Sequence, residues 1–433
     1  MKMFKIFFYL ALVLIFSGCI GQMESQIKPN QKVFEEEDAY ILFALRAEQL
    51  RDYESASELF NDLYEKSDKK EYLYRSLQNS IAAKKNAKVI EKVDDITAGK
   101  LDDFILIRIR IVALIQMQKF VEAKNLALEL VAVTKDVDDY ILLSDIYIKL
   151  KKFDTALKYL ESAYTRDYNE KILDKMSIIL YVNLQRKKDA IAQLETHTRV
   201  HGCSKLVCMR LIGFYSNENN VDGLLSTYLR LYKLNKDEAI SKRIIQIYGY
   251  KKEYVKLIGF LEDSGSDDDL LLQLYINSKN YKKASPLADK LYKKIGDINY
   301  LGQSAIFDYE SVANKNDKAM QKRVIKKLKE VIKTQENPLY LNYLGYLLID
   351  HKLDVKQGMK YVRRALRVEP KSAFYLDSLA WGYYKLGNCK EAYKIIKKVT
   401  KLEGGDDKEV LSHFKQIKKC VNKKVKKKGK KKK

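Results

Sequence analysis

Small residues recur at a nearly constant interval along most of this 433-residue chain. Their mean spacing is roughly 34 residues, a period typical of stacked helix pairs. Three members of the series, Ala87, Val255 and Ala319, fit the spacing and its neighbouring positions least well. Such a period predicts a row of similar units, each touching only its neighbours, rather than one compact core. The series is Ala56, Ala87, Ala123, Ala156, Ala190, Gly223, Val255, Ala284, Ala319, Gly358 and Ala392.

Two stretches near the C terminus carry the pattern most clearly. They read LNYLGYLLIDHKLDVKQGMKYVRRALRVEP and LDSLAWGYYKLGNCKEAYKIIKKVTKLEGG. Their apolar and small residues resemble a tetratricopeptide repeat. The resemblance implies an all-α fold, an α-solenoid of about ten or eleven antiparallel helix pairs over residues 36–404, with small residues where the two helices approach closely. The alternative is a generic helical protein with alanines at chance spacing, and the regular intervals after Ala123 disfavour it.

The sequence after the last unit predicts a helix that covers the end of the array. Gly404-Gly405 can end a helix in a left-handed turn, and Asp406 with Glu409 is similar to a capping box. We expect a capping helix over residues 405–421, apolar on one face and lysine-rich on the other. Residues 422–433 are mostly lysine and are expected to be disordered. This tail either binds anionic lipid or a cell-wall polymer, or stays solvated without a fixed partner.

The N terminus has the features of an export signal. Two lysines precede an apolar run, Ile6 to Phe16, that is shorter than the roughly 20 residues of a membrane span. The following Phe16-Ser17-Gly18-Cys19 resembles the lipobox of bacterial lipoproteins. The resemblance implies that residues 1–18 are removed, that Cys19 carries diacylglycerol and acyl lipid, and that residues 19–35 tether the array. The alternatives are an ordinary signal peptide with a chance cysteine, or an uncleaved anchor.

Two of the remaining cysteines lie in the C-terminal region. Cys389 is placed where the second helix of the last unit begins, and Cys420 is placed near the end of a capping helix that runs back beside it. Two antiparallel helices of similar length bring these positions to the same level. We therefore expect a Cys389–Cys420 disulfide, which an oxidising compartment would favour.

The other two cysteines, Cys203 and Cys208, follow His197 and His201 within twelve residues. Three interpretations are open for this group. A local Cys203–Cys208 disulfide is favoured, two buried free thiols come next, and a metal site made by all four side chains comes third, because the spacing matches no familiar zinc module.

The sequence shows no motif of catalysis. It lacks a nucleophile elbow, a phosphate-binding glycine loop and a zinc-protease helix motif, so we expect no enzyme activity and no cofactor besides the lipid on Cys19. The net charge is +24, and Lys2, Lys5 and the eleven lysines from Lys418 onward account for thirteen of these charges. Nucleic acid is disfavoured as a partner, because an exported chain rarely meets it.

A protein-binding groove is the best-supported kind of site. In the family that the repeats resemble, the first helix of each unit lines an inner groove. Carried onto the last two units, the resemblance implies Asn342, Tyr346, Asp377, Trp381 and Tyr384 as ligand-facing residues. Trp381 is the only tryptophan, and aromatic anchors dominate many interfaces. The alternative for Trp381 is packing against the neighbouring unit or the capping helix.

These features together resemble tetratricopeptide lipoproteins of the Gram-negative envelope. The implied function is a membrane-anchored scaffold that binds other envelope proteins and assembles a flagellar motor, a pilus secretin or an outer-membrane assembly complex. Ile20 after the lipidated cysteine implies the outer membrane, facing the periplasm. Two rival hypotheses are a cell-wall or glycan binder that uses the lysine-rich tail, and an enzyme within residues 299–336, where the period lengthens.

Overall fold

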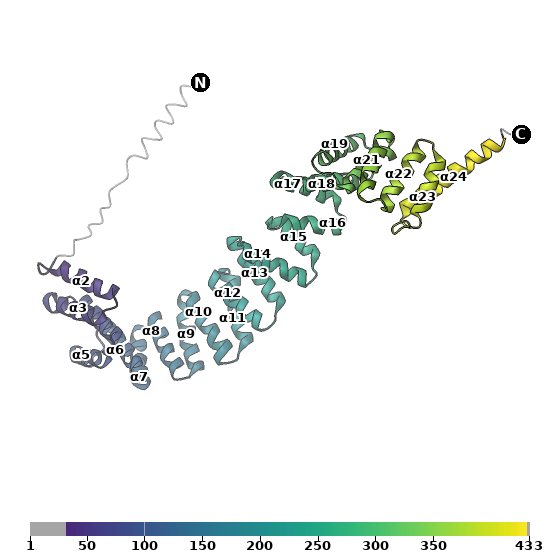
Figure 1. Ribbon diagram of the computed structural model, residues 1–433. Helices are drawn as coiled ribbons and strands as arrows, with labels where there is room; N and C mark the ends of the chain where they lie inside the picture. Colours follow the sequence, from purple (N-terminus) through teal and green to yellow (C-terminus); the bar gives the residue numbers. More distant parts are fainter. Residues whose placement is uncertain (1–31, 99, 431–433) are drawn as a thin grey trace, which may run out of the picture. The chain divides into compact units, whose positions relative to one another are not determined.

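The computed structural model describes residues 32–98 and 100–430, and within these ranges it contains helices and no strand (Figure 1). The N-terminal helices are α2 (Glu37–Gln49), α3 (Tyr53–Ser67), α4 (Lys70–Ala82), α5 (Asn86–Thr97), α6 (Phe104–Gln116), α7 (Phe120–Thr134), α8 (Val137–Lys149), α9 (Phe153–Asp167), α10 (Glu170–Ile178), α11 (Lys187–His201) and α12 (Lys205–Asn217). A π-helical turn, Ile179–Asn183, continues α10.

The remaining helices follow the same alternation. They are α13 (Val221–Asn235), α14 (Glu238–Tyr250), α15 (Tyr254–Ser264), α16 (Asp268–Asn277), α17 (Tyr281–Ile295), α18 (Ile298–Ser311), α19 (Lys318–Thr334), α20 (Pro338–Asp350), α21 (Val355–Val368), α22 (Ala373–Lys385), α23 (Cys389–Val399) and α24 (Lys408–Lys430). The described residues thus hold eleven successive helix pairs, from α2 with α3 to α22 with α23, followed by α24. The expectation of an all-α solenoid of tetratricopeptide type is confirmed.

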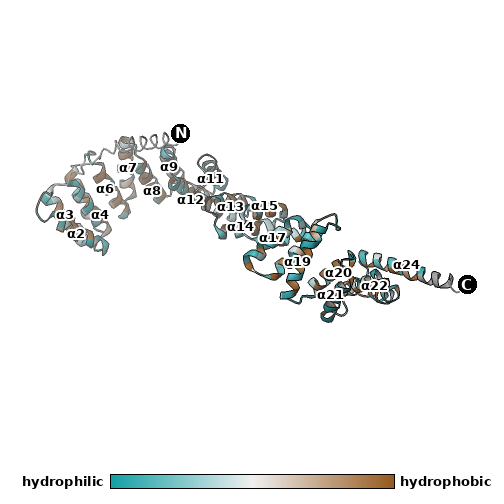
Figure 2. Ribbon diagram, turned by 90° about the horizontal axis from the view of Figure 1, so that it is seen from above, coloured by the Kyte–Doolittle hydropathy of each residue, from teal (hydrophilic) through white to brown (hydrophobic). Residues whose placement is uncertain are grey.

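The chain divides into two units, one ending at Leu231 and the other beginning at Tyr232, so the boundary lies inside α13. Within each unit, a helix packs on its partner and on the next helix along the chain. Hydrophobic and polar residues alternate along helices such as α19 (Figure 2), because one face packs inward and the other faces solvent. None of the described helices is both long and apolar enough to cross a bilayer.

Most of the recurring small residues lie where the two helices of a pair meet. Ala56, Ala123, Ala156, Ala190, Ala284 and Ala392 are fully buried. The three poorly fitting members do not lie there, since Ala87 and Ala319 are exposed and Val255 is 85% exposed. The buried residues at the equivalent positions are Val89, Leu257 and Val324. In these three helix pairs an aliphatic side chain fills the contact between the two helices. A search for small residues therefore selects a nearby exposed residue instead of the buried one.

The helices α20 and α21 approach each other closely at two glycines. A Cβ atom added to Gly358 would lie 2.6 Å from the Gly345 carbonyl oxygen and 2.8 Å from Ile349 Cγ1. A Cβ atom added to Gly345 would lie 2.8 Å from the Gly358 carbonyl oxygen. Both helices therefore need glycine at this contact, because any side chain would push the backbones apart.

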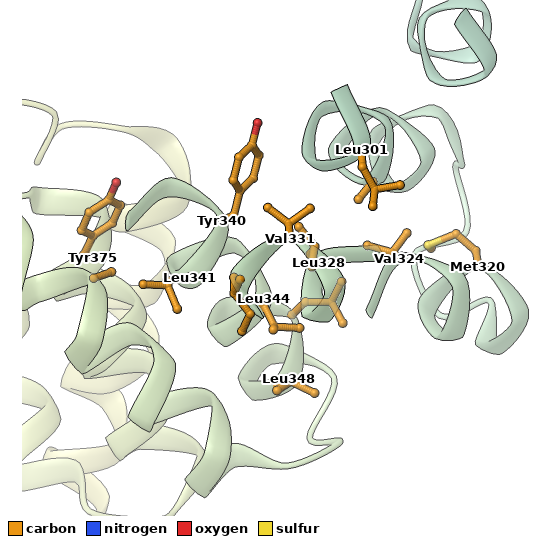
Figure 3. Close-up of a cluster of buried hydrophobic side chains, with 14 residues drawn as sticks. Leu301, Met320, Val324, Leu328, Val331, Tyr340, Leu341, Leu344, Leu348 and Tyr375 are labelled. Carbon is orange, nitrogen blue, oxygen red and sulfur yellow. The ribbon is translucent and has the colours of Figure 1, made fainter. Parts of the chain in front are cut away.

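The core next to this contact is built by α18, α19 and α20 (Figure 3). Val324, Leu328 and Val331 of α19 are fully buried against Leu301, Leu341 and Leu344. Residues 299–336, considered above as a separate enzymatic fold, therefore form an ordinary helix pair. The period lengthens there because residues 312–317 form a longer connection and α19 has 17 residues.

The first described helix is held to α4 by a buried carboxylate. Glu37 accepts hydrogen bonds from Lys69 Nζ (2.5 Å), the Tyr72 hydroxyl (2.7 Å) and the Val33 amide (2.7 Å). Burial alone would raise the pKa of Glu37, but these hydrogen bonds and the Lys69 charge outweigh it and lower the pKa to about 2. Glu37 therefore stays ionised and fixes this end of the array.

The helix after the last pair differs in detail from the expectation. Gly404 has a left-handed φ of 79°, as the sequence predicts. The residue that caps the next helix is Asp407, which accepts from the Glu409 amide at 2.8 Å, and not Asp406. The helix α24 spans Lys408–Lys430 instead of residues 405–421. Lysine is a good helix former and no proline follows, so the backbone continues as helix into the segment expected to be disordered.

Candidate functional site

The first helices of the C-terminal pairs line the inner face of this unit. Helices α20 and α22 contact each other directly, whereas the second helices α19 and α21 approach each other less closely. The predicted groove residues Asn342 and Tyr346 lie on α20, and Asp377, Trp381 and Tyr384 lie on α22. The five residues thus come from adjacent helices of one inner face.

The helix α24 lies against this face. The His413 ring stacks on the Trp381 ring with centroids 3.8 Å apart, and His413 Nδ1 pairs with Asp377 Oδ2 at 2.8 Å. The Tyr346 hydroxyl donates to Glu409, while Tyr384 stacks on Trp381 at 4.7 Å. Trp381 thus packs against the capping helix, the alternative that the sequence left open for it.

A second set of contacts holds Trp381 from the side of α20. Its Nε1 donates to Asp350 Oδ1 at 2.8 Å, and Lys385 Nζ donates to the same oxygen at 3.0 Å. Lys385 Nζ also lies over the Trp381 ring, 4.7 Å from its centroid. Burial would raise the pKa of Asp350, but the hydrogen bonds from Trp381 and Lys385 outweigh it and lower the pKa. The carboxylate therefore stays charged beside the tryptophan.

Beyond α24, the inner face carries tyrosines and carboxylates that the sequence did not single out. The Tyr343 hydroxyl donates to Glu310 Oε1 at 2.6 Å, and the Tyr309 hydroxyl lies 3.0 Å from His351 Nε2. Burial, followed by repulsion from Asp350, Glu310 and Glu409, raises the pKa of Tyr309 to about 12. These shifts place several carboxylates around the same tyrosine. Lys315 pairs with Glu310 and Lys385 pairs with Asp350, so the negative charge of the inner face is partly compensated.

Three buried acceptors on this face have no hydrogen-bond partner within the described part of the chain. They are Gln303 Oε1, Asn342 Oδ1 and Asp377 Oδ1. They lie on successive first helices, α18, α20 and α22, at the sixth, fifth and fifth residue of each helix. An unsatisfied buried acceptor costs about 1–3 kcal/mol. Because these three oxygens are buried in the free chain, a bound chain reaches them only where the neighbouring side chains move aside.

The cysteines pair as the sequence favours. Cys389 at the start of α23 is bonded to Cys420 of α24, with Cα atoms 5.9 Å apart, and Cys203 is bonded to Cys208, with Cα atoms 5.5 Å apart. The first bond ties α24 to the last helix pair. Cys19 lies outside the described residues.

The histidines near the second bond have other partners. His197 is buried, with Nδ1 2.7 Å from the Tyr164 hydroxyl and Nε2 3.4 Å from Glu170, and its ring lies 4.7 Å from that of His201. Both line a pocket of 680 Å³ between α9, α10 and α11. In the described ranges, no three His, Cys, Asp or Glu side chains are grouped so as to hold a metal ion.

Comparison with known proteins agrees with the helix-pair architecture. No family model matches the chain. The TPR repeat-containing protein MJ1428 of Methanocaldococcus jannaschii is 22% identical over 304 residues, which are 60% of this chain and 51% of that protein. The chain is similar to a tetratricopeptide-repeat protein. It spans about half the length of this curated relative.

Two solved structures are also similar. The crystal structure of the APC/C hetero-tetramer Cut9-Hcn1 matches with 10% identity and a TM-score of 0.35, over 89% of this chain and 97% of that chain. The structure of Naa15/Naa10 bound to HypK-THB matches with 12% identity and a TM-score of 0.28, over 88% of this chain and 66% of that chain.

Proposed function

We propose that this chain is a membrane-anchored scaffold that binds other envelope proteins through the inner face of α18, α20 and α22, and that it has no enzymatic activity. The observation that carries the proposal is the row of unpartnered acceptors, Gln303, Asn342 and Asp377. An extended polypeptide supplies N–H donors at regular intervals along its backbone. The surrounding carboxylates favour lysine or arginine side chains in that segment. The ligand is therefore an extended, cationic stretch of a protein partner.

The position of α24 limits where such a segment binds. Asp377 Oδ2 and Trp381 are already engaged by His413, so the α22 end of the face is largely filled. The α18 and α20 part, with Gln303, Asn342 and Tyr343, is not covered by contacts of this kind in the described residues. The partner segment would run over α18 and α20 and end at α24.

The proposed compartment is the bacterial envelope, with the chain held at the outer membrane by lipid on Cys19. The lipobox-like sequence and the short apolar run before it support this placement. Two bonded cysteine pairs, Cys203 with Cys208 and Cys389 with Cys420, fit an oxidising environment, since disulfides are rare where thiols are kept reduced. In that setting the scaffold would contribute to an envelope assembly such as a flagellar motor, a secretin or an outer-membrane complex.

Binding of synthetic peptides to the full chain tests the groove. We expect extended lysine-rich peptides to bind and acidic peptides of the same length not to bind. Replacing Gln303 and Asn342 together by leucine removes two acceptors, and the loss of two hydrogen bonds predicts roughly 10-fold weaker binding. Fluorescence anisotropy measures the change. The matched control is Gln335→Leu, an exposed amide outside these helices, and equal affinity of the double variant and the control would refute the assignment.

Metabolic labelling in the producing cells tests the anchor. A clickable fatty-acid analogue is expected to label the wild-type chain and to leave Cys19→Ser unlabelled, because the variant lacks the thiol whose sulfur receives the diacylglycerol. After the membranes are washed with high salt, which screens attachment through charge, the variant should leave the pellet and the wild type should stay. The circular dichroism of the variant should be unchanged. Labelling of Cys19→Ser to the wild-type level would contradict the lipid attachment.

A further inference from the structure

The second helices of the last three pairs carry basic residues in a repeated arrangement. On each helix four cations follow one another at spacings of four, three and four residues, and the whole set recurs after 34 residues. Spacings of this kind place the four cations of a helix on one face. The three rows are Lys322, Lys326, Lys329 and Lys333; Lys356, Lys360, Arg363 and Arg367; and Lys390, Lys394, Lys397 and Lys401. We call these twelve residues the basic lattice.

The structure puts the whole basic lattice on the outer face of this unit. All twelve residues are exposed. Eleven lie on α19, α21 and α23, and Lys401 lies two residues past the end of α23. The opposite sides of these helices are buried, as Val324, Leu328 and Val331 show for α19 (Figure 3). Within the described part of the chain, none of the twelve residues forms an ion pair with a carboxylate. The lattice is therefore an uncompensated positive surface that faces away from the groove.

Lysine-rich composition alone does not explain the lattice. The second helices near the N terminus have the same structural role, yet α3, α5, α7 and α9 carry net charges of −3, −1, −1 and −1. The corresponding helices near the C terminus, α17, α19, α21 and α23, carry +4, +6, +5 and +3. A uniform bias would have affected both groups. The positive charge is instead confined to the outer helices of the C-terminal pairs.

The fold gains little from this arrangement, in which Arg363 donates to the Tyr383 hydroxyl at 3.1 Å. Like charges three or four residues apart on a helix destabilise it by a few tenths of a kcal/mol per pair. Each row contains three such neighbouring pairs, and the outer face needs only polar residues to stay solvated. A surface that costs stability and repeats over three units indicates an anionic partner that spans those units.

We propose that the basic lattice binds the surface of a bilayer rich in anionic phospholipid. The cations form several rows on successive helices, so they present a broad array rather than a single track for one linear polymer. The aromatic residues of these helices, Tyr361 and Tyr393, are partly buried against the core, so they offer no free ring on which a nucleic-acid base could stack. Lysine dominates them, and a compact ammonium group contacts phosphate head groups without demanding a fixed geometry. Each lysine near such a surface contributes about 1 kcal/mol.

This inference goes beyond the proposed scaffold function, because it depends neither on Cys19 nor on the inner face. The full chain carrying Cys19→Ser is mixed with vesicles of phosphatidylcholine alone or with phosphatidylglycerol added, and binding is measured by flotation. We expect binding only to the anionic vesicles, and we expect added salt to weaken it. Three further variants each replace four lysines by glutamine and thus change the net charge equally.

The three variants separate the lattice from charge in general and from the lysine-rich end of α24. The lattice variant changes Lys326, Lys329, Lys360 and Lys394. The control variant changes four exposed lysines of the N-terminal unit that form no ion pair there, Lys88, Lys158, Lys171 and Lys188. The tail variant changes Lys426, Lys427, Lys428 and Lys430.

The lattice variant should bind anionic vesicles roughly 10- to 1000-fold more weakly, while the control variant stays close to the parent. Equal binding by the lattice and control variants would overturn the proposal. It would also fail if the tail variant alone lost binding, or if the parent bound heparin or DNA but not the vesicles. Peptide binding by the inner face is measured separately, so failure here leaves the scaffold test unaffected.

Discussion

Replacing Gly358 by valine is expected to lower the free energy of unfolding of the C-terminal unit by about 4 kcal/mol. The new Cβ would lie 2.6 Å from the Gly345 carbonyl oxygen, and neither backbone can yield without moving a helix. A unit of this size loses roughly 2–4 °C of melting temperature per kcal/mol. The melting temperature measured by circular dichroism should therefore be about 10 °C lower than in the wild type.

The matched control for this substitution is Gly259→Val in α15. Gly259 is also a helical glycine of the same unit, but a Cβ atom there would meet nothing within 4 Å. Valine has a better helix propensity than glycine, so this variant should melt at or slightly above the wild-type temperature. Equal melting of the two variants would mean that α20 and α21 do not approach as closely as described.

Truncation of Trp381 to alanine is expected to release α24 from the inner face. The substitution removes the stack on His413 and the hydrogen bond to Asp350. The cavity left by the missing indole lowers the free energy of unfolding by about 3–5 kcal/mol. The Cys389–Cys420 bond still tethers the helix, so release should be largest after reduction. Limited trypsin digestion followed by mass spectrometry would then show faster cleavage at Lys415 and Lys418.

The comparison for Trp381 uses an aromatic residue that packs on little. Tyr250 is 78% exposed, so Tyr250→Ala should alter neither melting nor trypsin cleavage of α24 under reducing conditions. If Trp381→Ala protected these two lysines as well as the wild type does, the packing of α24 against Trp381 would be disproved. Trp381 would then be free to contact a ligand, and peptide binding by Trp381→Ala would test that role.

The sequence predicts the helix pairs well because their contacts repeat. Alanine at Ala123, Ala156 and Ala190 marks the contact directly, since each is fully buried there. The rule fails at Leu257 and Val324, where the two helices enclose a larger side chain and a nearby exposed small or branched residue imitates the pattern. A search for aliphatic residues four positions apart, such as Val324 and Leu328, includes the position where these two helices meet.

The site was only partly predictable, for a physical reason. The resemblance to the tetratricopeptide family implied α20 and α22 and their inward residues, such as Asn342 and Asp377, because these positions correspond to the groove positions of that family. It did not decide what covers them, since α24 is not part of the period. Packing of Trp381 on the capping helix was only one of two alternatives, and the contacts of Glu409 and His413 decide between them. Tyr309 was missed because the carboxylates around it come from its own helix, α18, and from two other helices, α20 and α24.

The unpaired cations of the basic lattice, all on one side of the C-terminal unit, give this unit an electric dipole moment that points across the helix pairs. Carboxylates such as Glu310, Asp350 and Asp377 lie on one side, and the basic lattice lies on the other. A dipole moment in this direction orients the molecule in the electric field of an anionic bilayer, so it approaches the bilayer in one preferred orientation. In that orientation the acidic side is turned outward, toward whatever cationic segment arrives from solution.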